Sequence, residues 1–284
     1  MRRSMRVLGI SILVLTSLTA CIWSAAFAAD HRGVLAVSFL NVGQGNAVFI
    51  QAPSGRQVLI DGGPDTSVLR ALSSVMPWWD HSLDVVISTS PAKNDSTGLV
   101  DVLERFSAAR IIRSGVQTTD TFSRALDDAF AKAKESGAVI TTAKRGQAID
   151  LGRGAYIEIL SPDRNVQGVD AASGCTVVRV IYGTTSFLLP CDAPQALENY
   201  LVYLDGISLH SDVLLVGAHG AKTSSSPVFI GYVSPTYAVD SHDCKNVPTE
   251  EVSATLARFN VQIFDTCTDG TVMFVSDGET VRKD

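Results

Sequence analysis

Four cysteines beyond residue 28 are the first side chains whose type and number point to specific chemistry: Cys175, Cys191, Cys244 and Cys267. An even number of cysteines in an oxidising compartment indicates two disulfides, for which three connectivities exist. Cys175 and Cys191 each lie eight residues from Gly183, where two short strands meet in a turn, so an antiparallel hairpin could place them opposite each other. Cys244 would then pair with Cys267, and four buried free thiols are the alternative.

The N-terminus indicates a compartment in which such bonds form. Three arginines precede an uncharged apolar run, and an Ala-x-Ala site ends at Ala28. This order is typical of a secretory signal over residues 1–28, with the folded domain over residues 29–284. Two alternatives are a lipid-anchored Cys21 within a lipobox and an uncleaved apolar anchor. All three predict an extracytoplasmic domain, periplasmic or secreted, that meets the membrane only through its N-terminus.

The net charge of the mature domain bears on its partners. Residues 29–284 hold 20 basic against 29 acidic residues, a net charge of −9. This charge disfavours binding to a nucleic-acid backbone unless basic residues cluster on one face. The whole chain is 46% hydrophobic and 18% charged, which indicates a globular protein with a sizeable core.

Short strands and helices alternate along the chain and must position the polar side chains. Three apolar runs separated by glycine turns predict an opening β-meander that ends at Asp61. A buried strand over 83–88 leads into a polar loop over 89–97, and the apolar spacing over 99–106 predicts a helix. A strand, a loop and a helix in this order commonly present catalytic groups.

The second half of the chain repeats this alternation without a linker. Expected strands and helices are a hairpin over 176–189, strands over 212–217 and 236–240, helices over 193–204, 227–232 and 249–259, and a closing hairpin from runs over 261–264 and 271–275. We therefore predict one α/β domain of stacked layers.

Several motifs resemble those of a known family and occur in the same order. Phe39-Leu-Asn-Val-Gly-Gln-Gly-Asn-Ala and Leu59-Ile-Asp-Gly-Gly are similar to F-L-D-V-G-Q-G-D-A and L-I-D-G-G of the metallo-β-lactamase-like domain of ComEC-type DNA-uptake proteins. The similarity continues through 186–192, 212–226 and 269–272 and covers nearly the whole mature chain. It implies the four-layer αββα sandwich of the metallo-β-lactamase superfamily, with two facing mixed sheets and helices outside.

The resemblance also implies a metal site, but most of its ligand positions are changed here. The family holds one or two divalent metals, usually zinc, through an H-x-H-x-D-H loop, a later G-D, an H-H-G-S segment and often a further histidine. These positions read Ser90, Ala92, Asn94 and Asp95 in the loop, then Cys191-Asp192, Ala218-His219-Gly220-Ala221, and Asn246-Val247-Pro248. No imidazole remains in the loop.

The resemblance leaves a small set of ligands near the expected cleft. They are Asp61, Asp95, Asp192 and His219, with Ser90 and Asn94 as weaker candidates. Asp95, Asp192 and His219 are the metal candidates; they suit oxygen-preferring magnesium, manganese or calcium better than zinc. Alternatively, Asp61 and Asp192 bond backbone amides at strand ends, or Lys93 neutralises the acids. We expect no cofactor, since losses at several separate positions are difficult to repair with one aspartate.

An intact scaffold beside missing ligands predicts a catalytically inactive member of the family. Its role would be to bind a small ligand or a protein partner outside the cytoplasm. The alternative is a metal-dependent hydrolase or nuclease that cleaves phosphodiesters through a rebuilt, carboxylate-rich site and takes part in DNA uptake.

Overall fold

The computed structural model describes residues 12, 15–17, 19, 33–118, 121–246 and 248–284. Apart from residues 12, 15–17 and 19, the expected signal over 1–28 lies outside the described residues, as does its lipobox alternative at Cys21. In the part of the chain that is described, no helix is long and apolar enough to cross a bilayer.

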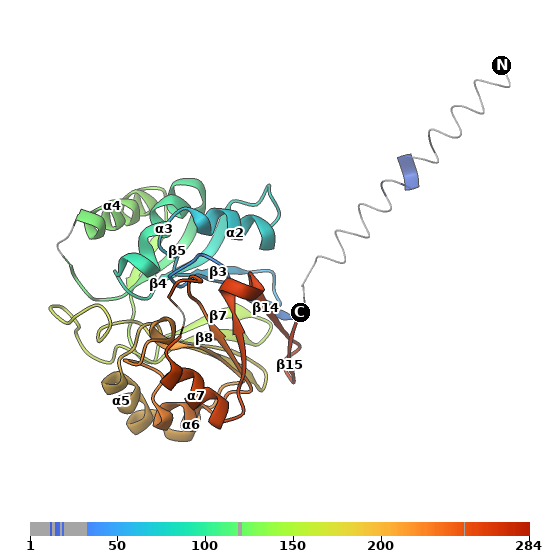
Figure 1. Cartoon of the computed structure of the whole chain (residues 1–284). Coiled ribbons are helices and arrows are strands. Elements are labelled where there is room, and N and C mark those ends of the chain that lie inside the picture. Colours follow the sequence, from blue (N-terminus) through green and yellow to red (C-terminus); the bar gives the residue numbers. More distant parts are fainter. Residues whose placement is uncertain (1–11, 13–14, 18, 20–32, 119–120, 247) are drawn as a thin grey trace, which may run out of the picture.

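The first sheet holds eight strands in the order β15-β14-β1-β2-β3-β4-β5-β6 (Figure 1). They are β1 (Leu35–Phe39), β2 (Val48–Gln51), β3 (Gln57–Ile60), β4 (Ser82–Ser88), β5 (Ser107–Arg113), β6 (Val139–Thr142), β14 (Val272–Ser276) and β15 (Val281–Lys283). Strands β1, β2 and β3 pair antiparallel, which confirms the predicted meander. Strands β3 to β6 are parallel.

The second sheet holds seven strands in the order β13-β12-β11-β10-β9-β8-β7. They are β7 (Ala148–Gly152), β8 (Ala155–Ile159), β9 (Val178–Tyr182), β10 (Thr185–Leu189), β11 (Val213–Leu215), β12 (Tyr237–Asp240) and β13 (Gln262–Asp265). Strands β10 to β13 are parallel. The predicted closing hairpin is wrong, because β13 pairs with β12 while β14 pairs with β1 of the other sheet. The short helix α8 (Thr266–Asp269) lies between these two strands where we expected a hairpin turn.

Helices cover the outer face of each sheet (Figure 1). On the first sheet lie α2 (Ser67–Val75), α3 (Lys93–Arg105) and α4 (Thr121–Glu135); on the second lie α5 (Gln195–Asp205), α6 (Pro227–Val233) and α7 (Glu250–Arg258), with the 3-10 turns η1 (Gly206–Leu209) and η2 (Gly217–Gly220). One apolar cluster, including Phe187 and Phe274, lies between the sheets. Two others lie beneath the helices, which confirms the predicted αββα sandwich.

Helix α3 begins at Lys93, earlier than the helix that we predicted from apolar spacing. The glycine turn after β3 packs directly against its first turns: the Gly62 amide donates to the Asp95 carbonyl at 2.6 Å, and the Gly98 amide donates to the Gly63 carbonyl at 3.0 Å. A Cβ atom at Gly98 would overlap the Gly62 carbonyl oxygen. This close approach fixes Asp95 beside the end of β3.

We therefore expect Gly98→Ala to lower the free energy of unfolding by about 3 kcal/mol, because backbone must move to make room for the methyl group. Urea unfolding measures the change. The matched control is Gly231→Ala in helix α6, where a Cβ atom would meet the Phe259 ring at an ordinary 3.4 Å. Because alanine favours helix over glycine, the control should be neutral or slightly stabilising. Equal losses in both variants would contradict the packing argument.

Candidate functional site

The polar cleft lies where parallel strands of both sheets end. Asp61 follows β3, Asp95 lies in the first turn of α3 after β4, Asp192 follows β10, and His219 lies in η2 after β11. The carboxyl ends of parallel strands meet at one edge of a sheet, and α/β folds commonly bind ligands there. The topology thus brings together side chains that lie up to 158 residues apart in the sequence.

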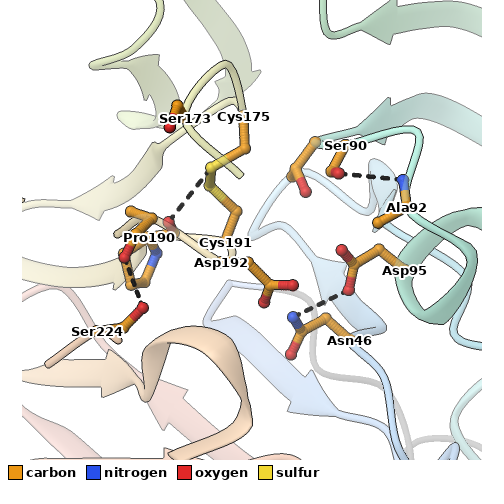
Figure 2. The surroundings of a disulfide bond; sticks show 12 residues. Asn46, Ser90, Ala92, Asp95, Ser173, Cys175, Pro190, Cys191, Asp192 and Ser224 are labelled. Carbon is orange, nitrogen blue, oxygen red and sulfur yellow. Dashed lines mark hydrogen bonds between the residues drawn. A yellow bond between two sulfur atoms is a disulfide. The ribbon is translucent and has the colours of Figure 1, made fainter. Parts of the chain in front are cut away.

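Three of the predicted residues form a compact group. Ligand atoms of Asp95, Asp192 and His219 all lie within 4.8 Å of one another. The Nε2 atom of His219 lies 3.7 Å from Asp192 Oδ1 and 4.0 Å from Asp95 Oδ1. Figure 2 shows the carboxylates of Asp95 and Asp192 on facing segments of the cleft.

The orientation of His219 is set by its backbone partner. Its Nδ1 atom lies 2.8 Å from the carbonyl oxygen of Ser241, which can only accept a hydrogen bond. Nδ1 therefore carries the hydrogen, and in the neutral ring Nε2 presents its lone pair to the cleft. The Asn94 amide lies 2.7 Å from Nε2 and 3.5 Å from Asp192 Oδ2, as a donor to both.

Asp95 is fully buried, and only one of its two carboxylate oxygens has a hydrogen-bond partner among the described residues. Its Oδ1 accepts from the Asn46 amide at 3.2 Å (Figure 2), while Oδ2 has no hydrogen-bond partner among the described residues. Asp192 Oδ1 is buried and equally unpartnered within the described structure. Burial raises the pKa of Asp95 well above its usual range, and the charges of Asp192 and Asp61 raise it further.

Asp61 lies near this group but is engaged elsewhere. Its carboxylate accepts from the Thr89 amide at 2.8 Å and from the Thr89 hydroxyl at 2.6 Å. This is the backbone bonding at a strand end that we considered as the alternative to ligation. Burial raises the pKa of Asp61 to about 8, although the Thr89 hydrogen bonds lower it in part.

The remaining loop residues do not join the group. The Ser90 hydroxyl accepts from the Ala92 amide at 3.1 Å and shapes the loop before α3. Lys93 is exposed, and within the described residues no ion pair connects it to the cleft acids, so the expectation that it neutralises them is wrong. Its position at the start of α3 turns its side chain to solvent while Asp95 faces inward.

Sequence reasoning missed three residues that support the site. Asn46 bonds Asp95, Thr89 bonds Asp61, and Ser241 orients His219. Only Asn46 could have been found from the sequence, because it stands where the motif of the similar family has an aspartate. Thr89 and Ser241 act partly through their backbone groups, which any residue type possesses.

The four cysteines form two disulfides, Cys175–Cys191 and Cys244–Cys267, in the predicted pairing. The hairpin register differs by one residue from the symmetric arrangement around Gly183, because Thr185 pairs with Tyr182 and Leu189 with Val178. The ladder ends at these last residues, and the chain beyond them bends enough for the sulfur atoms to meet.

The donor set fits a divalent cation. Two buried carboxylate oxygens without partners and an imidazole lone pair face one another, and removing such groups from water is costly unless they find a proton or a cation. Two carboxylates and one nitrogen could hold magnesium, manganese, calcium or zinc. Our expectation of no cofactor stays a prediction.

Comparison with curated proteins identifies competence proteins as relatives, although no family model matches the chain. Competence protein ComA of Neisseria gonorrhoeae is 36% identical over 124 residues, covering 43% of this chain and 18% of that protein. ComE operon protein 3 of Bacillus subtilis is 26% identical over 268 residues, covering 84% of this chain and 32% of that protein. The chain thus spans less than a third of either relative.

Solved structures establish the fold. The metallo-β-lactamase fold protein YhfI from Bacillus subtilis has a TM-score of 0.54 at 11% identity, covering 84% of this chain and 98% of YhfI. Igni18, a metallo hydrolase from Ignicoccus hospitalis, has the same TM-score at 13% identity and the same coverage. This chain therefore has the metallo-β-lactamase fold. Its sequence is in addition similar to those of the two competence proteins.

Proposed function

We propose that this domain is a catalytically inactive ComEC-type protein that binds a ligand or a protein partner through a cleft organised by one divalent cation. Asp95, Asp192 and His219 would hold the cation. When bound, such an ion polarises a phosphoryl oxygen and lowers the pKa of water. The aspartate that the similar family has at the position of Asn94, however, is absent here.

The observation that carries this proposal is the contact of Asn94 with His219. The neutral amide stands where the similar family has an aspartate, and it donates to His219 Nε2 and towards Asp192. An amide cannot take a proton from water, as a general base must. The Asp61 carboxyl already accepts from the Thr89 amide and hydroxyl, and in the metal-free chain burial raises its pKa to about 8, so it is a poor substitute for that aspartate.

Calorimetry with Mn²⁺, combined with a phosphodiesterase assay, tests this proposal. We expect the wild-type protein to bind one Mn²⁺ more tightly than about 1 mM, and a free ion at 100 times its Kd to add about 2.7 kcal/mol to the free energy of unfolding. Asp192→Ala should abolish binding, whereas Asp163→Ala, which removes a carboxylate outside the cleft, should not. No binding by the wild-type protein would overturn the cation site.

A metal-dependent hydrolase that cleaves phosphodiesters is the second candidate. The unpartnered oxygens of Asp95 and Asp192 beside His219 favour it. Turnover of bis-p-nitrophenyl phosphate that requires Mn²⁺ and is lost in Asp192→Ala would replace the inactive assignment with this one. Equal background rates in both proteins would support inactivity.

The proposed place of action is outside the cytoplasm, and the signal-like order of the N-terminal residues and the two disulfides support this. Mass spectrometry of the protein from a Gram-negative expression host should find a mature chain beginning at Ala29. A chain lipidated on Cys21 would indicate anchoring instead, and retention in the cytoplasm would contradict export.

Nucleic acid is not the partner that we propose, because the mature domain carries a net charge of −9. A gel-shift assay at low salt should leave duplex and single-stranded DNA unretarded. Retarded DNA would instead connect the domain to DNA uptake, as the names of its competence relatives suggest for those proteins.

A further inference from the structure

Cys191 forms a disulfide with Cys175 and directly precedes Asp192 in the sequence. This disulfide lies at the edge of the cleft (Figure 2). Pro190 to Ala193 form a tight turn in which the Ala193 amide donates to the Pro190 carbonyl at 3.2 Å. Cys191 occupies the first central position of this turn with a φ of 51°. Glycine takes this left-handed conformation readily, whereas a residue with a side chain does so at a cost.

The other half of the disulfide is firmly anchored. Cys175 is fully buried in the apolar cluster beneath α5 and α6. The next residue, Thr176, donates its amide hydrogen to the carbonyl of Thr89 at 2.8 Å, and Thr89 in turn binds Asp61. The disulfide thus links the turn that carries Asp192 to the loop that follows β4 in the other sheet.

The side chain of Asp192 has little else to hold it. Among the described residues its hydrogen bonding is limited to the Asn94 amide at 3.5 Å, and its Oδ1 has no partner. Its position 3.7 Å from His219 Nε2 therefore depends on the backbone of the turn.

We propose that the Cys175–Cys191 disulfide is a positioning element: it holds the turn in the left-handed conformation that directs Asp192 at His219. This inference rests on the proposed cation site, to which Asp192 contributes a ligand. Neither cysteine belongs to the group of ligand atoms formed by Asp95, Asp192 and His219. The bond acts through the main chain of Cys191, so a residue that adopts the same conformation without a disulfide should replace it.

Three double variants separate positioning from general stabilisation. C175S/C191S removes the disulfide and leaves a side chain at position 191. C175S/C191G also removes it but supplies a residue that tolerates positive φ. C244S/C267S removes the other disulfide and is the matched control. Circular dichroism and thermal unfolding establish that each variant is folded at the temperature of the experiment.

Calorimetry with Mn²⁺ and the absorption spectrum of the Co²⁺-loaded proteins report on the site. We expect C175S/C191S to bind Mn²⁺ about tenfold more weakly, as is typical when a supporting residue of a metal site is lost. Its Co²⁺ spectrum should differ from that of the wild-type protein, because Asp192 no longer faces His219. C175S/C191G should regain most of the affinity and the wild-type spectrum, and C244S/C267S should keep both. Wild-type affinity in folded C175S/C191S would overturn the proposal.

Crystal structures of the metal-free variants provide a readout that does not depend on the cation. The distance from Asp192 Oδ1 to His219 Nε2, 3.7 Å in the wild-type chain, should widen in C175S/C191S and return in C175S/C191G. If the wild-type protein binds no Mn²⁺, the proposed cation site fails, while this distance still decides the positioning role. If C175S/C191S does not fold, a widened distance in C175S/C191G overturns the proposal.

Discussion

The metal-free protein is expected to lose about 5 kcal/mol of unfolding free energy between pH 4 and pH 8 through Asp61 alone. Burial raises the pKa of this carboxyl from 3.8 to about 8 in the folded chain. In the unfolded chain the same group ionises near its ordinary value. The folded state therefore keeps a proton that the unfolded state has released throughout this interval.

The sign of the effect follows from this proton count. Below about pH 4 both states are protonated, and the stabilising contribution of neutral Asp61 is fully present. As the pH rises towards 8 the unfolded state binds one proton fewer, so stability falls by about 1.4 kcal/mol per pH unit. Above pH 8 both states are ionised and the loss is complete. Asp95, whose pKa is also raised by burial, adds a loss of the same sign.

Urea unfolding with a chelator present, at pH 5, 6, 7 and 8, measures this dependence, and Asp61→Asn isolates the contribution of Asp61. The asparagine oxygen can accept from the Thr89 amide, and the Thr89 hydroxyl can rotate to accept from the asparagine amide. The free energy of unfolding of the variant should fall less steeply with pH than that of wild type, by about 1.4 kcal/mol per pH unit. At pH 8 the variant should be more stable than wild type. Parallel pH profiles would show that Asp61 is ionised in the folded chain.

Individual strands and helices were predictable because their signals are local and repeated, whereas the αββα arrangement was an implication of the family resemblance. The opening meander, the buried strand before the polar loop and the disulfide hairpin each follow from apolar patterns and turn residues. The errors arose where tertiary contacts override such patterns. The first turn of α3 faces a polar cleft and therefore lacks the apolar spacing of a helix. The runs over 261–264 and 271–275 resemble a hairpin, but each strand pairs with a different sheet.

The site was predictable only as far as residue types carry information. Alignment of motifs pointed to Asp95, Asp192 and His219, which the topology brings together. It could not show whether Asp61 binds a metal or accepts hydrogen bonds from Thr89, since both roles use the same carboxylate. Nor could it reveal that the Asn94 amide contacts His219, because this contact depends on where α3 begins.

We expect Asn94→Asp to replace the amide that contacts His219 with a carboxylate that binds the cation. The substitution replaces a neutral donor between His219 and Asp192 with a carboxylate in a cleft that already holds three acids. Without metal, repulsion should lower the free energy of unfolding by about 2 kcal/mol. With metal, the added charged ligand should strengthen Mn²⁺ binding about 100-fold, since ligand charge strongly tunes affinity for hard cations.

Thermal unfolding with and without MnCl₂, together with calorimetry, measures both effects. The metal-dependent rise in Tm should be larger in Asn94→Asp than in wild type, although its metal-free Tm is lower. Asn260→Asp is the matched control: it adds the same charge at an exposed position with a left-handed φ of 55°, which aspartate tolerates. The control should match wild type in both measurements. If Asn94→Asp binds Mn²⁺ no more tightly than wild type, Asn94 does not face the cation site, and the argument that its amide stands in place of a general base fails with it.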